Sequence, residues 1–224
     1  MYLDLNNINF EKDKSIQLTE KQKDVLKELG NIGSGNAITA LSELLKKKIE
    51  MSLTSIDIIP FWKIPHLFGD VTKEVFGIYS KVIGENDFRI LQIYTKESII
   101  NMINNLTEFD KKSIKKIKDL NDLDDFSVSI ISEIGNILVG HYTSALANLL
   151  SISIIPSVPD LALDTIGALT SCAIAKFSKK LDFTLIIETT LKIEEMELDG
   201  ILCFIPSIET VENLLKIISL KYNM

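Results

Sequence analysis

Cysteine, histidine and tryptophan are scarce in this sequence of 224 residues, which contains two cysteines, two histidines and one tryptophan. With only His66 and His141 available, the sequence does not favour a Ser-His-Asp triad or a histidine-rich zinc site. The two cysteines, Cys172 and Cys203, stand among apolar residues. We therefore expect them to be small buried side chains in a reducing cytosol, with no disulfide between them.

Long apolar runs are absent as well. No stretch reaches the roughly 18–20 apolar residues that a membrane-spanning helix needs. The first residues lack the basic and apolar segments that are typical of a secretory signal. We therefore expect a cytoplasmic protein that does not insert into a membrane.

Positive charge is in deficit, because 24 basic residues face 31 acidic ones and the formal net charge is −7. Binding to nucleic-acid phosphates requires a basic patch, so we do not expect nucleic acid as the main partner. The one basic cluster, at 111–118, is interpreted as a solvated linker or helix face. No Gly-Lys-Ser/Thr phosphate-binding loop is present, and an enzyme that depends on ATP or NAD is not supported.

The sequence does contain one short pattern written twice: Asp or Ser, three residues, Glu, two residues, Asn. The first copy consists of Asp24, Glu28 and Asn31, and the second of Ser129, Glu133 and Asn136. Each member of the second copy follows its counterpart by 105 positions, and the same offset relates Leu41 to Leu146. A repeat that extends beyond the polar residues indicates an internal duplication.

On an α-helix, residues spaced by four and by three share one face, so each copy predicts a polar stripe. We call Asp24, Glu28 and Asn31 the first stripe, and Ser129, Glu133 and Asn136 the second stripe. A single Glu and Asn three residues apart usually mark only a solvated helix face. Two copies, each beside glycines that weaken a helix, favour a functional role.

Glycines accompany the first stripe at Gly30, Gly33 and Gly35. Each glycine inside a helix costs about 1 kcal/mol relative to alanine. Two explanations are compatible with each other. The glycines allow close packing against a neighbouring element, or they leave room beside Asn31 for a loop of a partner protein.

Apolar periodicity predicts an α+β chain. A first long helix is expected from Glu20 to about Leu45, with a capping box formed by Thr19 and Gln22. Strands are expected at 48–59, 75–82, 89–94, 151–155, 182–193 and 200–205, and further helices at 96–106, 122–150, 160–177 and 208–220. The expected organisation is a flexible arm at 1–18 and one domain at 19–224. Its pseudo-symmetric halves, 19–110 and 120–224, each pack a long helix on antiparallel strands.

The spacing between the halves is not constant. The apolar residues Ile90, Leu91 and Ile93 match Ile201, Leu202 and Phe204 at an offset of 111 rather than 105. About six extra residues are therefore expected in the second half, where they would lengthen the helix after Pro159. A surface that only one half has is either a partner site or a helix that simply covers the core.

The duplicated pattern resembles the signature of the CheC phosphatases of bacterial chemotaxis, relatives of CheX and of the flagellar switch protein FliY. The signature, Asp/Ser-x3-Glu-x2-Asn, is intact in both copies, and the resemblance extends from about Lys21 to about Leu215. It includes Gly-Asn-Ile-Gly-Ser-Gly-Asn-Ala at 30–37 and Glu-Ile-Gly-Asn-Ile-Leu-Val-Gly at 133–140. The resemblance implies an internally duplicated CheC-like fold.

The resemblance also implies a function: hydrolysis of the aspartyl phosphate of the response regulator CheY. Asn31 and Asn136 would orient the attacking water, and Glu28 and Glu133 would pair with the regulator's active-site lysine. Asp24 and Ser129 would make supporting contacts. The chain itself would bind no cofactor, because the regulator supplies the Mg²⁺.

Family members also bind the receptor deamidase CheD through a helix of the second half, where Asp164 is the candidate contact. An alternative is a non-enzymatic adaptor that binds CheY-phosphate and CheD to tune receptor adaptation. A flagellar switch component is less favoured, because the chain ends at Met224 without room for a further switch domain. A monomer is expected, since one chain carries both stripes.

Overall fold

A computed structural model describes most of the chain. The described residues are 19–84, 88–106, 117–176, 183–194, 196–206, 210, 213, 216–217 and 219–220. The expected arm at 1–18 and most of the basic cluster at 111–118 lie outside the described residues.

The first long helix, α1, spans Glu20–Leu45 as predicted. Its capping box is closed: the Thr19 hydroxyl accepts a hydrogen bond from the Gln22 backbone N–H at 3.3 Å, and the Gln22 side chain accepts one from the Thr19 N–H at 2.9 Å. The helix ends at Lys46, which adopts the left-handed conformation with φ 52°. The capping box is thus a local sequence signal that fixes where α1 begins.

The second long helix, α4, spans Asp125–Leu150 and has the same length of 26 residues. The Asp124 carboxylate caps it by accepting a hydrogen bond from the Ser127 N–H at 2.7 Å. It also ends in the left-handed conformation, at Ser151 with φ 56°. The two long helices thus share length and end geometry, as a duplication predicts.

Seven strands form one antiparallel sheet. They are β1 (Ile49–Pro60), β2 (Glu74–Gly84), β3 (Phe88–Thr95), β4 (Ile154–Pro156), β5 (Asp160–Thr165), β6 (Phe183–Ile193) and β7 (Met196–Pro206). Their order is β1-β6-β7-β3-β2-β4, and β5 also pairs with β2. The first strand of each half therefore pairs with a strand of the other half. The two halves are interwoven rather than placed side by side.

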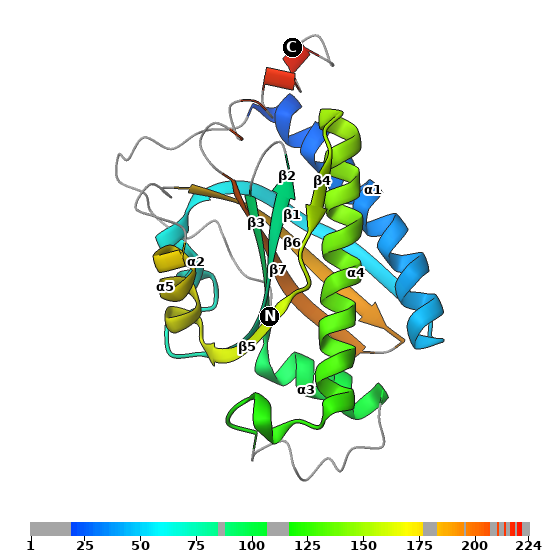
Figure 1. The fold of residues 1–224 in the computed structure, drawn as a ribbon, viewed down its shortest axis with the longest axis vertical. Helices are drawn as coiled ribbons and strands as arrows, with labels where there is room; N and C mark the ends of the chain where they lie inside the picture. The colour runs from blue at the N-terminus through cyan, green and yellow to red at the C-terminus, as the bar shows by residue number, and fades with distance from the viewer. Residues whose placement is uncertain are drawn as a thin grey trace.

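Helices cover both faces of this sheet (Figure 1). On one face α1 and α4 lie side by side and run in opposite directions, over a buried cluster that includes Leu26, Phe76 and Tyr142. On the other face lie the short helices α2 (Ile64–Leu67) and α5 (Ile166–Lys176), over a second buried cluster. The helix α3 (Lys96–Leu106) follows β3 with the predicted bounds. Both stripes are therefore carried by the same layer.

The predicted helix at 160–177 is wrong in its first third. Residues 160–165 form β5, which pairs with β2 from Tyr79 to Glu74, and α5 begins only at Ile166. The alternate residues Leu161 and Leu163 pack against the main core cluster. Pairing with the edge of β2 satisfies the backbone groups of this segment, and this long-range contact overrides its local preference.

One row of cross-strand neighbours shows how the halves correspond. Ser55 on β1 faces Glu188 on β6, and Asp160 on β5 faces Tyr79 on β2. Asp160 follows Ser55 by 105 positions, whereas Glu188 follows Tyr79 by 109. The second half thus gains four residues around α5 rather than six. The second-half helix is still the longer, with 11 residues in α5 against 4 in α2.

The two cysteines have different surroundings. Both are free thiols, but only Cys203 is buried, while Cys172 is exposed on α5. The expectation that both are buried is therefore wrong for Cys172. The residues that follow it in the sequence are apolar, but its side chain lies on the exposed side of α5. In the part of the chain that the structure describes, no helix has the length and apolar character to cross a bilayer.

Candidate functional site

The structure places both stripes on the outer surface of the long helices. All six side chains are exposed: Asp24, Glu28 and Asn31 on α1, and Ser129, Glu133 and Asn136 on α4. Each helix turns its apolar residues towards the sheet, with Leu26 on α1 and Ile134 on α4 almost completely buried. The polar side chains of both stripes are therefore accessible to a partner protein.

Behind the first stripe, α1 approaches α4 closely. A Cβ at Gly33 would stand 2.9 Å from the ring of Tyr142, which is fully buried. The hydroxyl groups of Ser34 and Tyr142 are 2.7 Å apart, and the Ser34 hydroxyl also donates to the Gly30 carbonyl at 2.7 Å. Close packing is thus the reason for glycine at position 33.

Behind the second stripe, α4 rests on the central strands. A Cβ at Gly135 would stand 2.7 Å from the Ile78 side chain. The Gln92 amide on β3 donates to the Gly135 carbonyl at 2.9 Å, and the Tyr94 hydroxyl donates to the Gln92 side-chain oxygen at 3.0 Å. Gln92 is fully buried, so these two bonds satisfy an otherwise costly polar group.

Two other glycines have no packing explanation. A Cβ at Gly35 or at Gly140 would meet nothing within 4 Å. Each lies four residues after the asparagine of its stripe, on the same side of the helix. Gly140 follows Gly35 by 105 positions, so the duplication retains the pair. These glycines leave open space beside Asn31 and Asn136.

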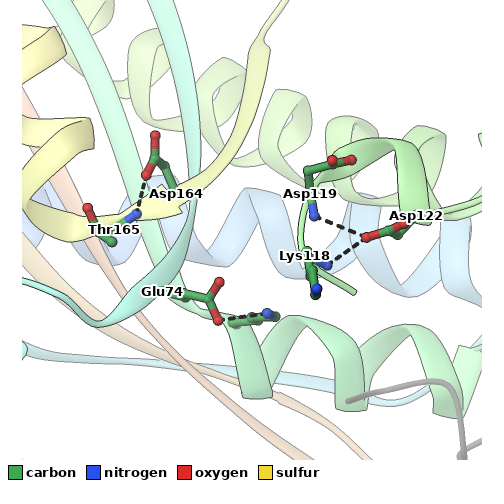
Figure 2. A network of polar contacts seen from close by, with 7 residues as sticks. Glu74, Lys118, Asp119, Asp122, Asp164 and Thr165 are labelled. Carbon is green, nitrogen blue, oxygen red and sulfur yellow. Dashed lines mark hydrogen bonds and ion pairs between the residues drawn. The ribbon is translucent and has the colours of Figure 1, made fainter. Parts of the chain in front are cut away.

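The turn before α4 is a short 3-10 segment, η4 (Leu120–Asp122). The Asp122 carboxylate accepts hydrogen bonds from the backbone N–H groups of Lys118, at 2.6 Å, and Asp119, at 3.2 Å (Figure 2). These hydrogen bonds lower the pKa of Asp122, so the carboxylate stays ionised and continues to hold the turn at neutral pH. The turn fixes where α4 starts, and with it the second stripe.

Asp164 does not lie on a helix, as the sequence suggested, but on β5. It is exposed, and its carboxylate accepts a hydrogen bond from the Thr165 N–H at 2.7 Å (Figure 2). The neighbouring strand contributes Glu74, which faces Thr165 across the pair and forms an ion pair with Lys96 at 2.7 Å. Asp164 therefore lies on a strand, whereas both stripes lie on helices, and its role stays a prediction.

Metal ligands do not gather anywhere among the described residues: no group of three or more His, Cys, Asp or Glu side chains could hold an ion there. Sequence reasoning did not identify Ser34, Gln92, Tyr94 or Tyr142. One signal was available, because Gln92 is a polar residue in the otherwise apolar run Ile90–Ile93. Its partner, Gly135 on α4, could not be found without the fold.

The chain has recognisable relatives. A family model described as "CheC-like family" matches residues 22–52 and 126–163, one segment around each stripe. The chain is 30% identical over 202 residues to the "CheY-P phosphatase CheC" of Bacillus subtilis (strain 168), covering 88% of this chain and 93% of that protein. A shorter match, 41% identical over 51 residues, covers 23% of this chain and 14% of the flagellar motor switch phosphatase FliY of the same organism.

Solved structures share the fold. FliY of Thermotoga maritima superposes with a TM-score of 0.68 at 18% identity, over 91% of this chain and 98% of that one. The middle domain of FliM from H. pylori gives 0.62 at 8% identity, over 89% and 99%. The chain thus shares its fold, two long helices on one antiparallel sheet, with these flagellar proteins. Among proteins of this fold, the chain belongs to the CheC-like family, as its signature predicted.

Proposed function

We propose that this chain is a phosphatase that hydrolyses the aspartyl phosphate of the chemotaxis response regulator CheY. One observation carries the proposal: two exposed asparagines occupy equivalent positions on two helices, each with an open glycine one turn further on. The chain's similarity to a protein named as a CheY-P phosphatase supports the same substrate.

The chemistry needs little from this protein beyond orientation. A water attacks phosphorus, the bond from phosphorus to the aspartate oxygen breaks, and inorganic phosphate leaves a free carboxylate on the regulator. The regulator would supply Mg²⁺ and a lysine, and the developing charge is stabilised there. The carboxamide oxygen of Asn31 or Asn136 accepts a hydrogen bond from the water and its NH₂ group donates, which fixes the direction of attack.

The glutamates have a different role in this proposal. Glu28 and Glu133 stand one helical turn before the asparagines and are exposed. Paired with the regulator's lysine, each would place its helix over the phosphoaspartate, so replacement by glutamine should weaken docking more than bond breaking. Asp24 and Ser129, a further turn back, would contact the regulator without touching the reacting atoms.

The experiment follows the decay of phosphorylated CheY with the wild-type chain, Asn31→Ala, Asn136→Ala and the double variant. We expect the double variant to leave only the regulator's own decay rate, and each single variant to keep part of the activity. A double variant as active as the wild type would refute the role of the asparagines. A wild-type chain that binds phosphorylated CheY without accelerating decay would instead be an adaptor.

We also propose that CheD binds at the segment β5–α5, which is longer than its counterpart in the first half. Asp164 is exposed there and tests the surface without disturbing the core. Asp164→Lys should weaken CheD binding in a titration and leave CheY-phosphate decay unchanged. Equal CheD affinity of variant and wild type would remove Asp164 from the interface.

A further inference from the structure

Gly30 and Gly135 occupy equivalent positions, each directly before the asparagine of its stripe. The carbonyl of each accepts a hydrogen bond from a buried side chain in addition to its place in the helix. Ser34 donates to Gly30 and is itself bonded to Tyr142, while Gln92 donates to Gly135 and is itself bonded to Tyr94. In both halves the backbone next to the asparagine is therefore held from inside the core.

The two donors are not equivalent to each other. The residue 105 positions after Ser34 is Val139, which has no hydrogen to donate. In the sheet, Tyr79 faces Leu91 and its counterpart Glu188 faces Ile201. These pairs relate β3 to β7 at an offset of 110, so the offset of 111 expected from the apolar residues is wrong by one position.

The offset of 110 makes Leu202 the counterpart of Gln92, and the two also face each other across the β3–β7 pair. Gln92 therefore stands at the pseudo-twofold axis between the halves, and its amide donates to α4. The counterpart of Tyr94 is Phe204, so β7 lacks the whole polar pair. The duplication did not supply the second hydrogen bond: the two equivalent carbonyls have donors that are not equivalent, Ser34 and Gln92, and both donors belong to the first half.

The orientation of the Gln92 amide is determined by its surroundings. The Tyr94 hydroxyl can donate to the amide oxygen, which leaves the NH₂ group to face Gly135. Burial raises the pKa of Tyr94, and the neighbouring Tyr142 raises it further, so the phenol keeps its proton. The hydrogen bond to α4 is thus held in one arrangement.

An apolar contact alone would hold α4 less well. Ile78 packs closely against Gly135, but an apolar contact is not directional. A hydrogen bond is directional and fixes both position and rotation. A displacement of about 1 Å at a reacting group can cost on the order of a hundredfold in rate.

We propose that Gln92, held by Tyr94, is the positioning residue for Asn136, and that Ser34, held by Tyr142, is the positioning residue for Asn31. The inference rests on the proposed phosphatase activity. Its consequence is that each stripe depends on a different buried residue, although the exposed asparagines are the same.

The test uses each stripe alone. In the Asn31→Ala background only the second stripe is active, and in the Asn136→Ala background only the first. The double change Gln92→Leu and Tyr94→Phe gives β3 the residues that β7 already carries. We expect it to lower kcat about tenfold in the Asn31→Ala background, with KM within about twofold, because alignment rather than docking is lost. In the Asn136→Ala background kcat should stay within about twofold.

Ser34→Ala should show the opposite selectivity. Equal loss in both backgrounds, or no loss in either, would overturn the inference while leaving the proposed function intact. An active Asn31→Ala/Asn136→Ala double variant would overturn the function itself. If the Leu/Phe double change does not fold, Tyr94→Phe alone replaces it, and amide exchange at Val139, whose helical partner is the Gly135 carbonyl, should rise relative to α1. Unchanged exchange at Val139 would also refute the inference.

Discussion

The first and second stripes present the same Glu and Asn side chains on different supports. Each has an exposed Glu and Asn and an open glycine one turn beyond. Beneath them, however, Gly30 of α1 packs on Leu53 of the edge strand β1, whereas Gly135 of α4 packs on Ile78 of β2, further inside the sheet. The duplication has kept the exposed Glu and Asn of each stripe and changed the side chains that pack directly beneath them.

The stripes also differ at their N-terminal rims. Phe126 lies three residues before Ser129 and is 63% exposed, which is unusual for a large aromatic side chain. Its counterpart 105 positions earlier is Lys21. A regulator that docks on the second stripe would meet an aromatic ring where the first stripe offers a cation.

The largest expected difference concerns the asparagines taken singly. Because α4 is held by the inner strands and by Gln92, its asparagine should be the better oriented. We expect the rate of CheY-phosphate decay at saturating regulator to be about tenfold lower with Asn136→Ala than with Asn31→Ala. Equal losses would mean that the buried support does not rank the stripes.

A second prediction tests the close contact between α1 and Tyr142. In Gly33→Ala the new methyl group would stand 2.9 Å from a ring that is fully buried. Overpacking of this kind costs about 1–3 kcal/mol, more than the gain from replacing glycine in a helix. Urea unfolding should show a net loss of stability. A more stable variant would mean that the Tyr142 ring can move aside.

The open glycines should behave in the opposite way. Gly35→Ala and Gly140→Ala have free space for the methyl group, so each should gain up to about 1 kcal/mol in urea unfolding. If the space serves a partner, Gly35→Ala should slow hydrolysis in the Asn136→Ala background, and Gly140→Ala in the Asn31→Ala background. Greater stability together with unchanged hydrolysis would show that the partner does not use this space.

The smallest expected effect on stability concerns Glu188 in the β1–β6 pair, whose counterpart in the β5–β2 pair is Tyr79. Glu188 faces Ser55, whose hydroxyl donates to one carboxylate oxygen at 2.8 Å, and the other oxygen is buried without a partner among the described residues. Burial raises the pKa of Glu188, partly offset by Ser55. The folded state therefore favours the neutral acid, and ionisation above the folded pKa costs stability.

Glu188→Gln should accordingly stabilise the protein by about 1 kcal/mol at pH 8, because a buried amide carries no charge that burial would disfavour. The advantage should disappear as the pH falls through the folded pKa towards the unfolded value of about 4.3. Urea unfolding at several pH values measures this, with the exposed Glu43→Gln as a control that should show no difference. An advantage independent of pH would contradict ionisation as the cause.

Local signals predicted much of the fold. The capping box at Thr19 and the bounds of α3 follow from neighbouring residues alone, and the structure confirms them. The segment 160–165 was assigned wrongly because its state depends on β2, which lies far away in sequence. The exchange of strands between halves has the same cause, since nothing local specifies which half a strand joins.

The candidate site divides in the same way. Helical spacing alone predicted that both stripes face outward, and the structure agrees. The buried donors Ser34 and Gln92 were not predicted, because both form hydrogen bonds to residues of α4, a helix that lies far from them in the sequence. Spacing distinguishes the faces of one helix, but it does not identify what touches the inner face.

The exchange of strands between the halves has a consequence for fragments of the chain. A chain cut inside 107–116 would yield two fragments, and neither would contain the strand that covers its own β2 or β6. Each fragment alone would expose an apolar sheet edge and aggregate. When the two fragments are expressed together, we expect them to associate into the native fold. The covalent link between the halves would then be dispensable, whereas the pairing of strands between them would not.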